Sequence, residues 1–215
     1  MKTLKSIIII VLLILSLSCN RDDKEPQPIA DTKLILPAML ENNTQISIPD
    51  ATVSGTTLIP GIIASIIEID KDGIIQDPSK IFLELDLSHS FAGDIVVELI
   101  APSGENCGII KRIGTTNDTS PGSSINLVLG NKLKFNSLFT TFFLPQVSTF
   151  IVAGNYAPSR GVSSIPFSVP MTSLNTFFMD KNIKGKWTLK VYDYQNNDIG
   201  KLISWKLYFD TGALK

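Results

Sequence analysis

The sequence predicts an all-β fold in which two antiparallel sheets pack face to face as a β-sandwich. Three observations lead to this prediction. Apolar residues recur at every second position in several runs, turn-forming residues separate the runs, and no amphipathic helix has both start and stop signals. Residues 44–210 have the length of one sandwich of about eight strands around a single core. We therefore expect one domain.

Four runs show the alternation that is typical of a half-buried strand, with one apolar face and one face in water. The positions between the apolar ones carry mostly polar side chains, such as Glu98 and Lys190. The apolar positions are Leu83, Leu85 and Leu87, then Ile95, Val97 and Leu99, then Trp187, Leu189 and Val191, and finally Ile203, Trp205, Leu207 and Phe209.

Turn-forming residues mark the ends of these runs. The segment Asp70–Gly73 also resembles half of an EF-hand calcium loop, but it lacks the third ligand and the terminal glutamate. A hairpin turn is therefore the favoured interpretation of that segment. The turn signals are Asp72-Gly73, Pro102-Ser103-Gly104, Pro121-Gly122 and Asn196-Asn197.

The composition excludes several classes of function. The chain has 215 residues, of which 44% are hydrophobic and 18% charged, and its formal net charge is -1. A nucleic-acid-binding surface needs more positive charge than this, so we expect no nucleic-acid partner. Two cysteines exclude a disulfide-dense scaffold, and a single histidine weakens zinc sites and catalytic triads. Cys107 is expected to be a small buried hydrophobe.

The N-terminus resembles the secretion signal of a bacterial lipoprotein. Lys2 and Lys5 precede the apolar run 7–15, which is too short for a bilayer span of about 20 residues. The following residues, Leu15 to Cys19, are similar to a lipobox, which implies that residues 1–18 are removed and that Cys19 carries lipid. The prediction is a protein anchored by lipid in the bacterial outer membrane or at the cell surface. A membrane anchor helix and a Cys19–Cys107 disulfide are the alternatives.

Residues 19–43 are predicted to be a flexible tether, and residues 44–215 to be the β-sandwich domain. Pro26, Pro28 and Pro37 oppose helix in the tether. The charged cluster 20–25 resembles the tag of surface-exported lipoproteins, with a plain solvated linker as the alternative. A short strand over residues 32–36 is the alternative for that part of the tether.

Three segments together resemble the P domain, also called P/Homo B, that follows the catalytic domain in kexin and furin-type proteases. The first is Leu87–Gly104, with a histidine, an aromatic residue, Gly-Asp, an alternating strand and Pro-Ser-Gly. The second is Gly154–Pro158, which is similar to Gly-x-Tyr-x-Pro. The third is Gly185–Leu207, with Gly-x-Trp-x-Leu-x-Val-x-Asp followed by Gly-x-Leu-x-x-Trp-x-Leu. The resemblance covers residues 44–210 and implies a jelly-roll sandwich.

Within this resemblance, His89, Gly93, Trp187 and Trp205 are expected to be structural residues. Gly93 suits a tight turn with positive φ, and the two tryptophans suit core packing. Some members of the family bind calcium, which the resemblance would place at Asp94, Asp193 and Asp198. The alternative is that these carboxylates serve caps and turns.

Two parts of the chain depart from the pattern. Glu105, Asn106 and Cys107 stand where threonine is usual in the family, and residues 131–150 follow no family pattern. Within the second part, residues 139–144 are interpreted as a buried strand, with an exposed patch for a partner as the alternative.

The residues favour a binding module over an enzyme. His89 is the single histidine and lies in the family motif, and no Gly-x-Ser-x-Gly elbow is present. We therefore expect no catalytic residue and no peptidase activity. A link to proteolysis is expected only through the association of this family with proteases. The predicted function is a lipid-anchored module that binds a protein or a glycan. An accessory subunit that stabilises a secreted serine protease in trans is the alternative, and the oligomeric state is open.

Overall fold

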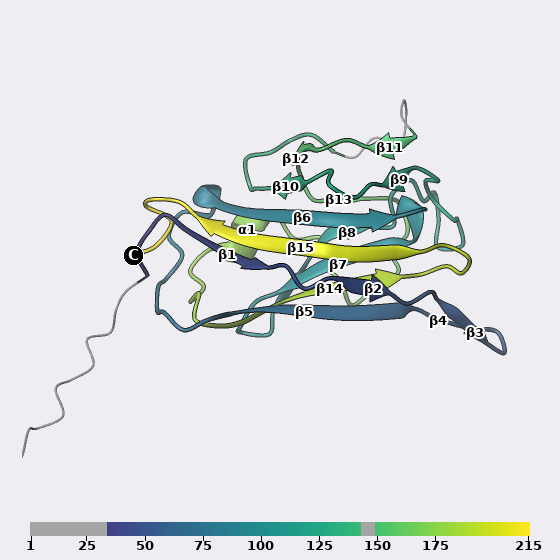
Figure 1. The fold of residues 1–215 in the computed structure, drawn as a ribbon, viewed down its shortest axis with the longest axis horizontal. Coiled ribbons are helices and arrows are strands. Elements are labelled where there is room, and N and C mark those ends of the chain that lie inside the picture. Colours follow the sequence, from purple (N-terminus) through teal and green to yellow (C-terminus); the bar gives the residue numbers. More distant parts are fainter. Residues whose placement is uncertain (1–33, 143–148) are drawn as a thin grey trace, which may run out of the picture. The chain divides into compact units, whose positions relative to one another are not determined.

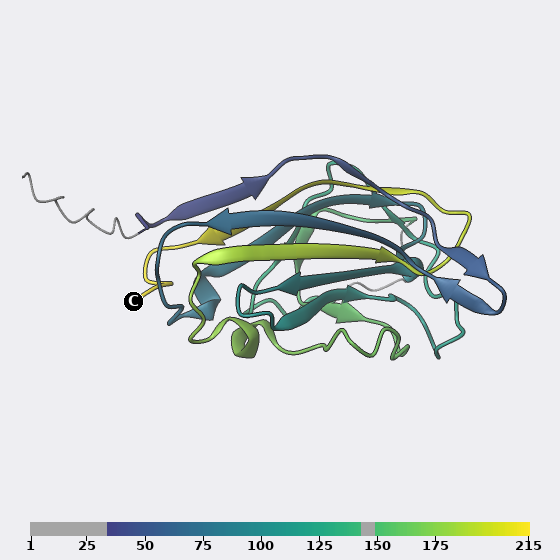
Figure 2. The ribbon, with the colours of Figure 1, turned by 90° about the horizontal axis from the view of Figure 1, so that it is seen from below.

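The computed structural model describes residues 34–142 and 149–215, which belong to one compact unit (Figure 1). These residues form two main sheets packed together as a β-sandwich, so the predicted fold class is confirmed. In two perpendicular views the long strands of both sheets run along the same direction, as in aligned sandwiches (Figures 1 and 2). The predicted signal peptide, Cys19 and most of the predicted tether lie outside the described residues.

The larger sheet has eight strands and centres on the long pair β6 and β15. Its members are β1 (Ala38–Asn42), β2 (Ile46–Ile48), β6 (Ile81–His89), β9 (Asn126–Leu127), β10 (Leu133–Phe135), β11 (Phe150–Ile151), β12 (Gly154–Tyr156) and β15 (Gly200–Phe209). β15 pairs with β1 and β2 on one side and with β6 on the other, always antiparallel.

The smaller main sheet has five strands in the order β13-β8-β7-β14-β5. Its members are β5 (Gly61–Ile69), β7 (Ile95–Ile100), β8 (Asn106–Lys111), β13 (Ser159–Arg160) and β14 (Gly185–Asp193). A two-stranded hairpin joins β2 to β5, and three short helical segments lie in loops. These elements are β3 (Thr52–Ser54), β4 (Thr57–Ile59), the 3-10 helices η1 (Pro78–Lys80) and η2 (Ala92–Asp94), and α1 (Leu174–Phe178).

Three short pairs are parallel, which the antiparallel prediction missed. β10 pairs with β12, β9 with β11, and β8 with β13 in parallel. Five of these six strands have only two or three residues, too few to show an alternation in the sequence. The long strands, whose alternation was visible, are antiparallel as expected.

The core lies between the two main sheets and is filled by their inward-facing side chains. Trp187 on β14 and Trp205 on β15 are the largest, and both have no exposed surface. The Trp187 indole packs against Phe177 and Phe178 of α1, with ring centroids 6.3 and 5.9 Å away. The helix therefore closes one part of the core, and Ser173 caps it by accepting the N–H of Thr176.

The alternation predicted for the last strand is interrupted by a bulge. The pairing of β15 with β6 shifts between Leu202 and Ser204, so Leu202 and Trp205 are buried while Ile203 is only half-buried. The prediction that Ile203 shares the face of Trp205 was wrong. An extra residue in one strand shifts the alternation, and nothing in the sequence marks its position.

The strand β7 is buried on both faces, although one face in water was predicted. Glu98 on its outer side is only 2% exposed, because residues 163–173, here called the covering segment, lie over this sheet. Lys111 of β8 holds the segment by donating from Nζ to the carbonyls of Pro166 and Val169, at 2.8 and 3.0 Å. Asn106 adds a bond from Nδ2 to the carbonyl of Ser168 at 2.8 Å.

The ordered sheet begins within the residues assigned to the tether. Residues 38–42 form β1, which pairs with residues 205–209 of β15 in continuous register. Residues 34–36 are not a strand, so the alternative strand over 32–36 is wrong for its described part. Because β1 shows only a weak alternation of half-buried and exposed positions, it resembled a linker in the sequence.

Two loop interpretations also need correction. Asp72-Gly73 does not turn a hairpin, because β5 and β6 belong to different sheets and the loop crosses between them. Asp72 instead accepts hydrogen bonds from Lys184 and Asn182.

Residues 139–142 are not a strand: Phe142 is 55% exposed, and the carbonyl of Thr141 accepts the N–H of Ala157. Residues 143 and 144 lie outside the described residues.

The Pro102-Ser103-Gly104 turn was predicted correctly. It joins β7 to β8, with Gly104 at φ +89°. Within residues 34–142 and 149–215, no helix has the length and hydropathy that a membrane-spanning segment needs.

Candidate functional site

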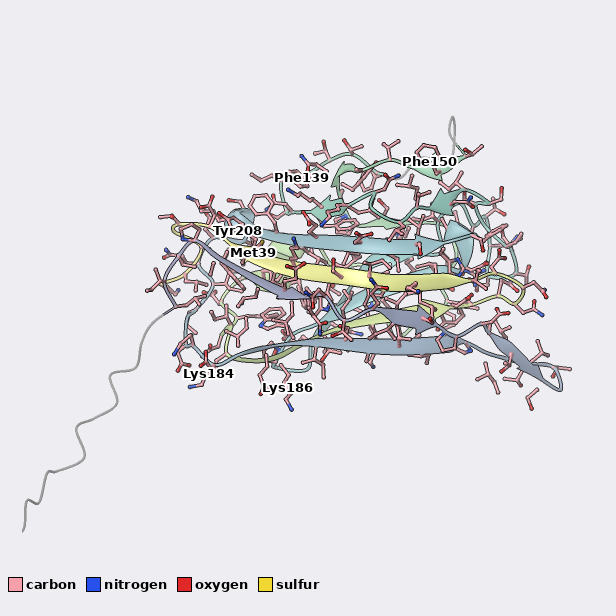
Figure 3. All side chains as sticks on the ribbon, in the orientation of Figure 1. Met39, Phe139, Phe150, Lys184, Lys186 and Tyr208 are labelled. Carbon is pink, nitrogen blue, oxygen red and sulfur yellow. The ribbon has the colours of Figure 1, made fainter. Side chains whose placement is uncertain are left out.

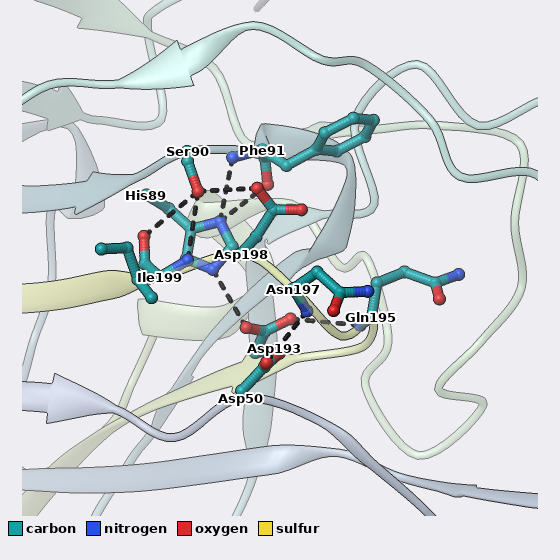
Figure 4. Close-up of polar contacts among 9 residues, drawn as sticks. All are labelled: Asp50, His89, Ser90, Phe91, Asp193, Gln195, Asn197, Asp198 and Ile199. Carbon is teal, nitrogen blue, oxygen red and sulfur yellow. Dashed lines mark hydrogen bonds and ion pairs between the residues drawn. The ribbon is translucent and has the colours of Figure 1, made fainter.

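The single histidine pairs with a buried carboxylate where the ends of the two sheets meet. His89 is the last residue of β6 and Asp193 the last of β14, and the side chains of both are fully buried. His89 Nε2 lies 3.1 Å from Asp193 Oδ2, and Nδ1 lies 2.9 Å from the carbonyl oxygen of Phe91 (Figure 4). Both ring nitrogens are therefore engaged, and a protonated ring donates to both oxygens.

The charge of the pair is set by opposing effects. Burial lowers the pKa of His89, but the hydrogen bond and the charge of Asp193 outweigh it, and the net pKa is raised above the usual value. Asp193 also accepts the backbone N–H of Gln195 at 3.1 Å. We interpret the arrangement as an internal ion pair that joins the two sheets.

Asp94 lies beside this pair in a more unfavourable environment. It is 1% exposed, and its Oδ1 has no hydrogen-bond partner among the described residues. Burial raises its pKa to about 7, and the charge of Asp193 acts in the same direction. The charges of Arg112 and His89 oppose the rise. Asp94 therefore holds a proton at or just below neutral pH.

Arg112 is the buried cation of this region, and the sequence interpretation missed it. Its Nε donates to the carbonyl of Gly93 at 2.7 Å and its Nη2 to the carbonyl of Ser120 at 3.0 Å. The guanidinium also lies 5.8 Å from the centroid of the Tyr194 ring. Arg112 directly follows β8, and no motif in the sequence distinguishes it from a surface arginine.

The loop between β14 and β15 is fastened to the end of β6 by a second set of polar contacts. Ser90 Oγ donates to Asp198 Oδ1 at 2.7 Å and accepts the N–H of Ile199 at 3.1 Å (Figure 4). Asn197, which has a left-handed φ of +80°, donates its N–H to Asp50 Oδ2 at 2.9 Å. Asp198 and Asp193 thus face different partners.

Of the three carboxylates that the resemblance assigned to calcium, two have side-chain partners in the described chain. Asp193 is engaged by His89 and Asp198 by Ser90, which leaves Asp94 as the carboxylate with an unpartnered oxygen. Across the described part of the chain, no three histidine, cysteine, aspartate or glutamate side chains converge closely enough to hold a metal ion. The arrangement accommodates a proton and an ion pair.

Within residues 34–142 and 149–215, no hydroxyl or thiol is hydrogen-bonded to the His89 ring. The described hydrogen-bond partners of the His89 ring are Phe91 and Asp193, and none is a serine hydroxyl. Ser163 and Ser164 instead bond to Asp118. Acid–base catalysis needs a base within reach of a substrate proton, and the buried ring of His89 is not accessible to one.

The glycine before Asp94 is required for close packing, not for positive φ as predicted. Gly93 lies in η2 and has no positive φ. A Cβ built on it would lie 2.3 Å from the carbonyl oxygen of Pro121 and 2.6 Å from the nitrogen of Ser123. The Gly93 N–H donates to the carbonyl of Ser123, so the two backbones are in direct contact.

Comparison with known families adds an independent finding. Residues 159–209 match the Proprotein convertase P-domain. The P-domain match covers 51 of the 215 residues, from β13 to the end of β15, and includes Trp187, Asp193 and Trp205. Leu87–Gly104 and Gly154–Pro158, which also resemble the family, lie before the matched range.

The similar proteins are bacterial proteases much longer than the region they share with this chain. A transglutaminase-activating metalloprotease from Streptomyces mobaraensis is 31% identical over 68 residues, which are 32% of this chain and 8% of that protein. The crystal structure of a serine protease of Aeromonas sobria covers 84% of this chain and 28% of its own, at 16% identity and a TM-score of 0.36. The complex of that protease with its chaperone covers 81% and 27%, at 17% identity and a TM-score of 0.34.

Proposed function

We propose that the chain is a non-catalytic P-domain module, held on the cell envelope by lipid at Cys19, that binds a protein or a glycan. The observation that carries this proposal is the closed environment of His89, whose ring nitrogens are both engaged within the protein. The P-domain match over residues 159–209 supports the module class.

The enzymatic part of the proposal is tested by incubating the purified chain with unstructured protein and peptide substrates. We expect no hydrolysis above the rate of a sample without protein. Turnover that disappears in His89→Ala, while the circular dichroism of the variant matches that of the wild type, would refute the non-catalytic assignment.

The anchoring part is tested by detergent phase partitioning of the protein expressed in a bacterium that processes lipoproteins. The wild type is expected in the detergent phase, with a mass that includes acyl chains. Cys19→Ser is expected to remain unprocessed and without acyl chains. A wild-type protein without acyl mass would contradict the anchor. Cys107→Ser is the matched control, because that thiol is buried and should not affect acylation.

A second candidate function is an accessory subunit that stabilises a protease in trans. It is favoured by the name of the curated relative, a metalloprotease that is 31% identical to this chain over 68 residues. A pull-down from solubilised envelope, with the bound proteins identified, separates the two. Recovery of a protease whose melting temperature rises on adding the chain supports the accessory role, and recovery of glycan or of a non-protease supports the binding module.

A further inference from the structure

The described residues form a groove of about 940 Å³, which is within the usual size of ligand sites of about 300–1,000 Å³. Its walls come from the loop after β10, from β13 with the residues on either side, and from the residues before and at the start of α1. The groove is open to solvent, and neither His89 nor Asp193 lines it. The lining residues are 114–115, 136, 137, 139, 142, 157–162 and 171–174.

The strand β13 lines this groove, and a backbone N–H and C=O of this strand are available for hydrogen bonds. β13 ends the order of the five-stranded sheet and pairs with β8 on one side. The Gly161 N–H donates to the carbonyl of Lys111 at 2.9 Å. In a parallel ladder this places the N–H and C=O of Arg160 on the side away from β8. An extended segment can pair with such an edge, a common mode of peptide recognition.

The charge in the groove has one sign. Arg160 is the charged side chain among the lining residues, and it is exposed. Its charge also lowers the pKa of Lys111, after burial, while the charge of Asp118 acts in the opposite direction. The remaining lining side chains are apolar or carry hydroxyls. They include Phe139, Phe142, Val162, Met171 and Leu174, with Thr115, Ser137, Ser159, Thr172 and Ser173.

One of these hydroxyls has no partner of its own. Ser137 Oγ is buried and makes no hydrogen bond to any residue of the described ranges. An unpaired hydroxyl costs free energy unless another group pairs with it.

We propose that this groove binds an extended peptide segment that carries a carboxylate, with apolar side chains beside it. The carboxylate pairs with the guanidinium of Arg160, the peptide backbone pairs with the edge of β13, and apolar side chains lie against Phe142 and Val162. This inference rests on the proposed binding function and names its partner as a protein with an acidic, extended segment. A polyanion such as a nucleic acid is disfavoured because the groove offers one exposed cation.

The test measures the binding of two labelled probe peptides to the full chain by fluorescence anisotropy. Both are five-residue peptides of valine and threonine, acetylated at the N-terminus and amidated at the C-terminus, one with a central glutamate and the other with glutamine. The glutamate peptide is expected to bind about tenfold more tightly, as a charge-assisted hydrogen bond predicts. Arg160→Gln is expected to remove this preference and to leave the affinity for the glutamine peptide unchanged.

Two further variants control for charge and for folding. Lys186→Gln removes the same charge from a surface on the far side of the molecule from Phe139 (Figure 3) and is expected to change neither affinity. Val162 is 73% exposed, so its substitution leaves the core intact. Val162→Asp should weaken binding of the glutamate peptide, and Val162→Lys should strengthen it.

Three results would overturn the assignment. They are no binding of either peptide at millimolar concentration, equal affinity for the two peptides, and an unchanged preference in Arg160→Gln. The proposed function is tested separately, by the pull-down from solubilised envelope. If the Arg160→Gln chain recovers the same partner as the wild type, the binding function stands and this groove is not the binding site.

Discussion

The imidazole of His89 and the carboxylate of Asp193 form a fully buried pair, with 3.1 Å between Nε2 and Oδ2, that joins the end of β6 to the end of β14. The two residues are 104 positions apart in the chain. They connect the two sheets of the sandwich at the ends of β6 and β14. The pair therefore contributes to the stability of the fold, and its protonation state makes that contribution depend on pH.

His89→Ala is expected to lower the free energy of unfolding by about 3–5 kcal/mol, because it leaves the Asp193 carboxylate buried without its partner. The pKa of His89 is raised in the folded state. The stabilisation from its protonated ring is therefore complete below a pH of about 6.5, and it is lost as the pH rises through the folded-state pKa. The loss on substitution should thus be larger at about pH 5.5 than at about pH 9 in urea unfolding. Ser90→Ala, an exposed neighbour, is the control and should cost about 1 kcal/mol. Equal losses from both variants would contradict the role of the pair.

Asp94→Asn is expected to stabilise the protein above neutral pH. The pKa of Asp94 is about 7 in the folded chain against 3.8 as the ordinary value, so the wild type loses stability as pH rises between these values. The amide removes this loss, and a gain of at least about 1 kcal/mol is expected at about pH 8, with little change near pH 4. Asp70→Asn, at an exposed carboxylate, should show no such dependence.

The same variant separates a proton from a calcium ion at this position. If Asp94 were a metal ligand, Asp94→Asn would lower the melting temperature in millimolar calcium, and a chelator would lower that of the wild type. We expect neither change, because Asp193 and Asp198 are already engaged by His89 and Ser90.

Gly93→Ala is expected to destabilise the protein by about 3 kcal/mol, because the new methyl group would overlap the backbone at Pro121 and Ser123. Gly55→Ala is a matched control. Gly55 has φ +63° and no atom within 4 Å of an added Cβ, so its substitution should cost about 1 kcal/mol from the left-handed backbone alone. Thermal unfolding of the two variants measures the difference. A milder effect at Gly93 than at Gly55 would mean that the contact with the Pro121 loop is not tight.

The thiol of Cys107 is expected to be unreactive in the folded protein. It has no exposed surface, its Sγ lies 3.1 Å from the carbonyl of Thr172, and burial raises its pKa to about 12. In a Cys19→Ser background, a colorimetric thiol reagent at about pH 8 should modify the chain only after denaturant is added. Rapid modification of the native chain would show that the covering segment above Cys107 opens.

Ser65→Ala is expected to cost about 1–3 kcal/mol, because the Trp205 indole N–H donates to Ser65 Oγ at 2.9 Å across the two sheets and would lose its buried acceptor. Trp205→Phe removes the donor as well. In a double-mutant cycle, the double variant should therefore lose less unfolding free energy than the sum of the losses in the two single variants. Ser54→Ala, at an exposed position of β3, gives the background for a serine substitution. Full additivity would exclude a contribution from this bond.

The sequence predicted the parts of the fold whose pattern is local. The alternation in residues 82–88 and 187–192 marks strands that lie in β6 and β14, and the Pro102–Gly104 turn joins two paired strands. Features that depend on distant partners were not visible. The bulge at Leu202–Ser204 depends on the register with β6, and the burial of Glu98 depends on a segment more than 60 residues away.

The candidate site was predicted in its members but not in its contacts. His89, Asp94 and Asp193 came from the family resemblance, which did not indicate that Asp193 faces the imidazole or that Asp94 would lack a partner. Arg112 was missed because an arginine after a strand usually lies at the surface, whereas Gly93, Ser120 and Tyr194 surround this one. Buried charge depends on the complete fold, which residue patterns do not describe.

The position of β15 has a consequence for how the chain reaches its native state. β15, the last strand of the described residues, lies between β6 on one side and β1 and β2 on the other, so none of these three strands can pair with it until residues 200–209 emerge. Contacts of such long sequence separation slow folding. A nascent chain of this topology would therefore stay unfolded through most of its synthesis, and early termination before β15 would expose unpaired strand edges that favour aggregation.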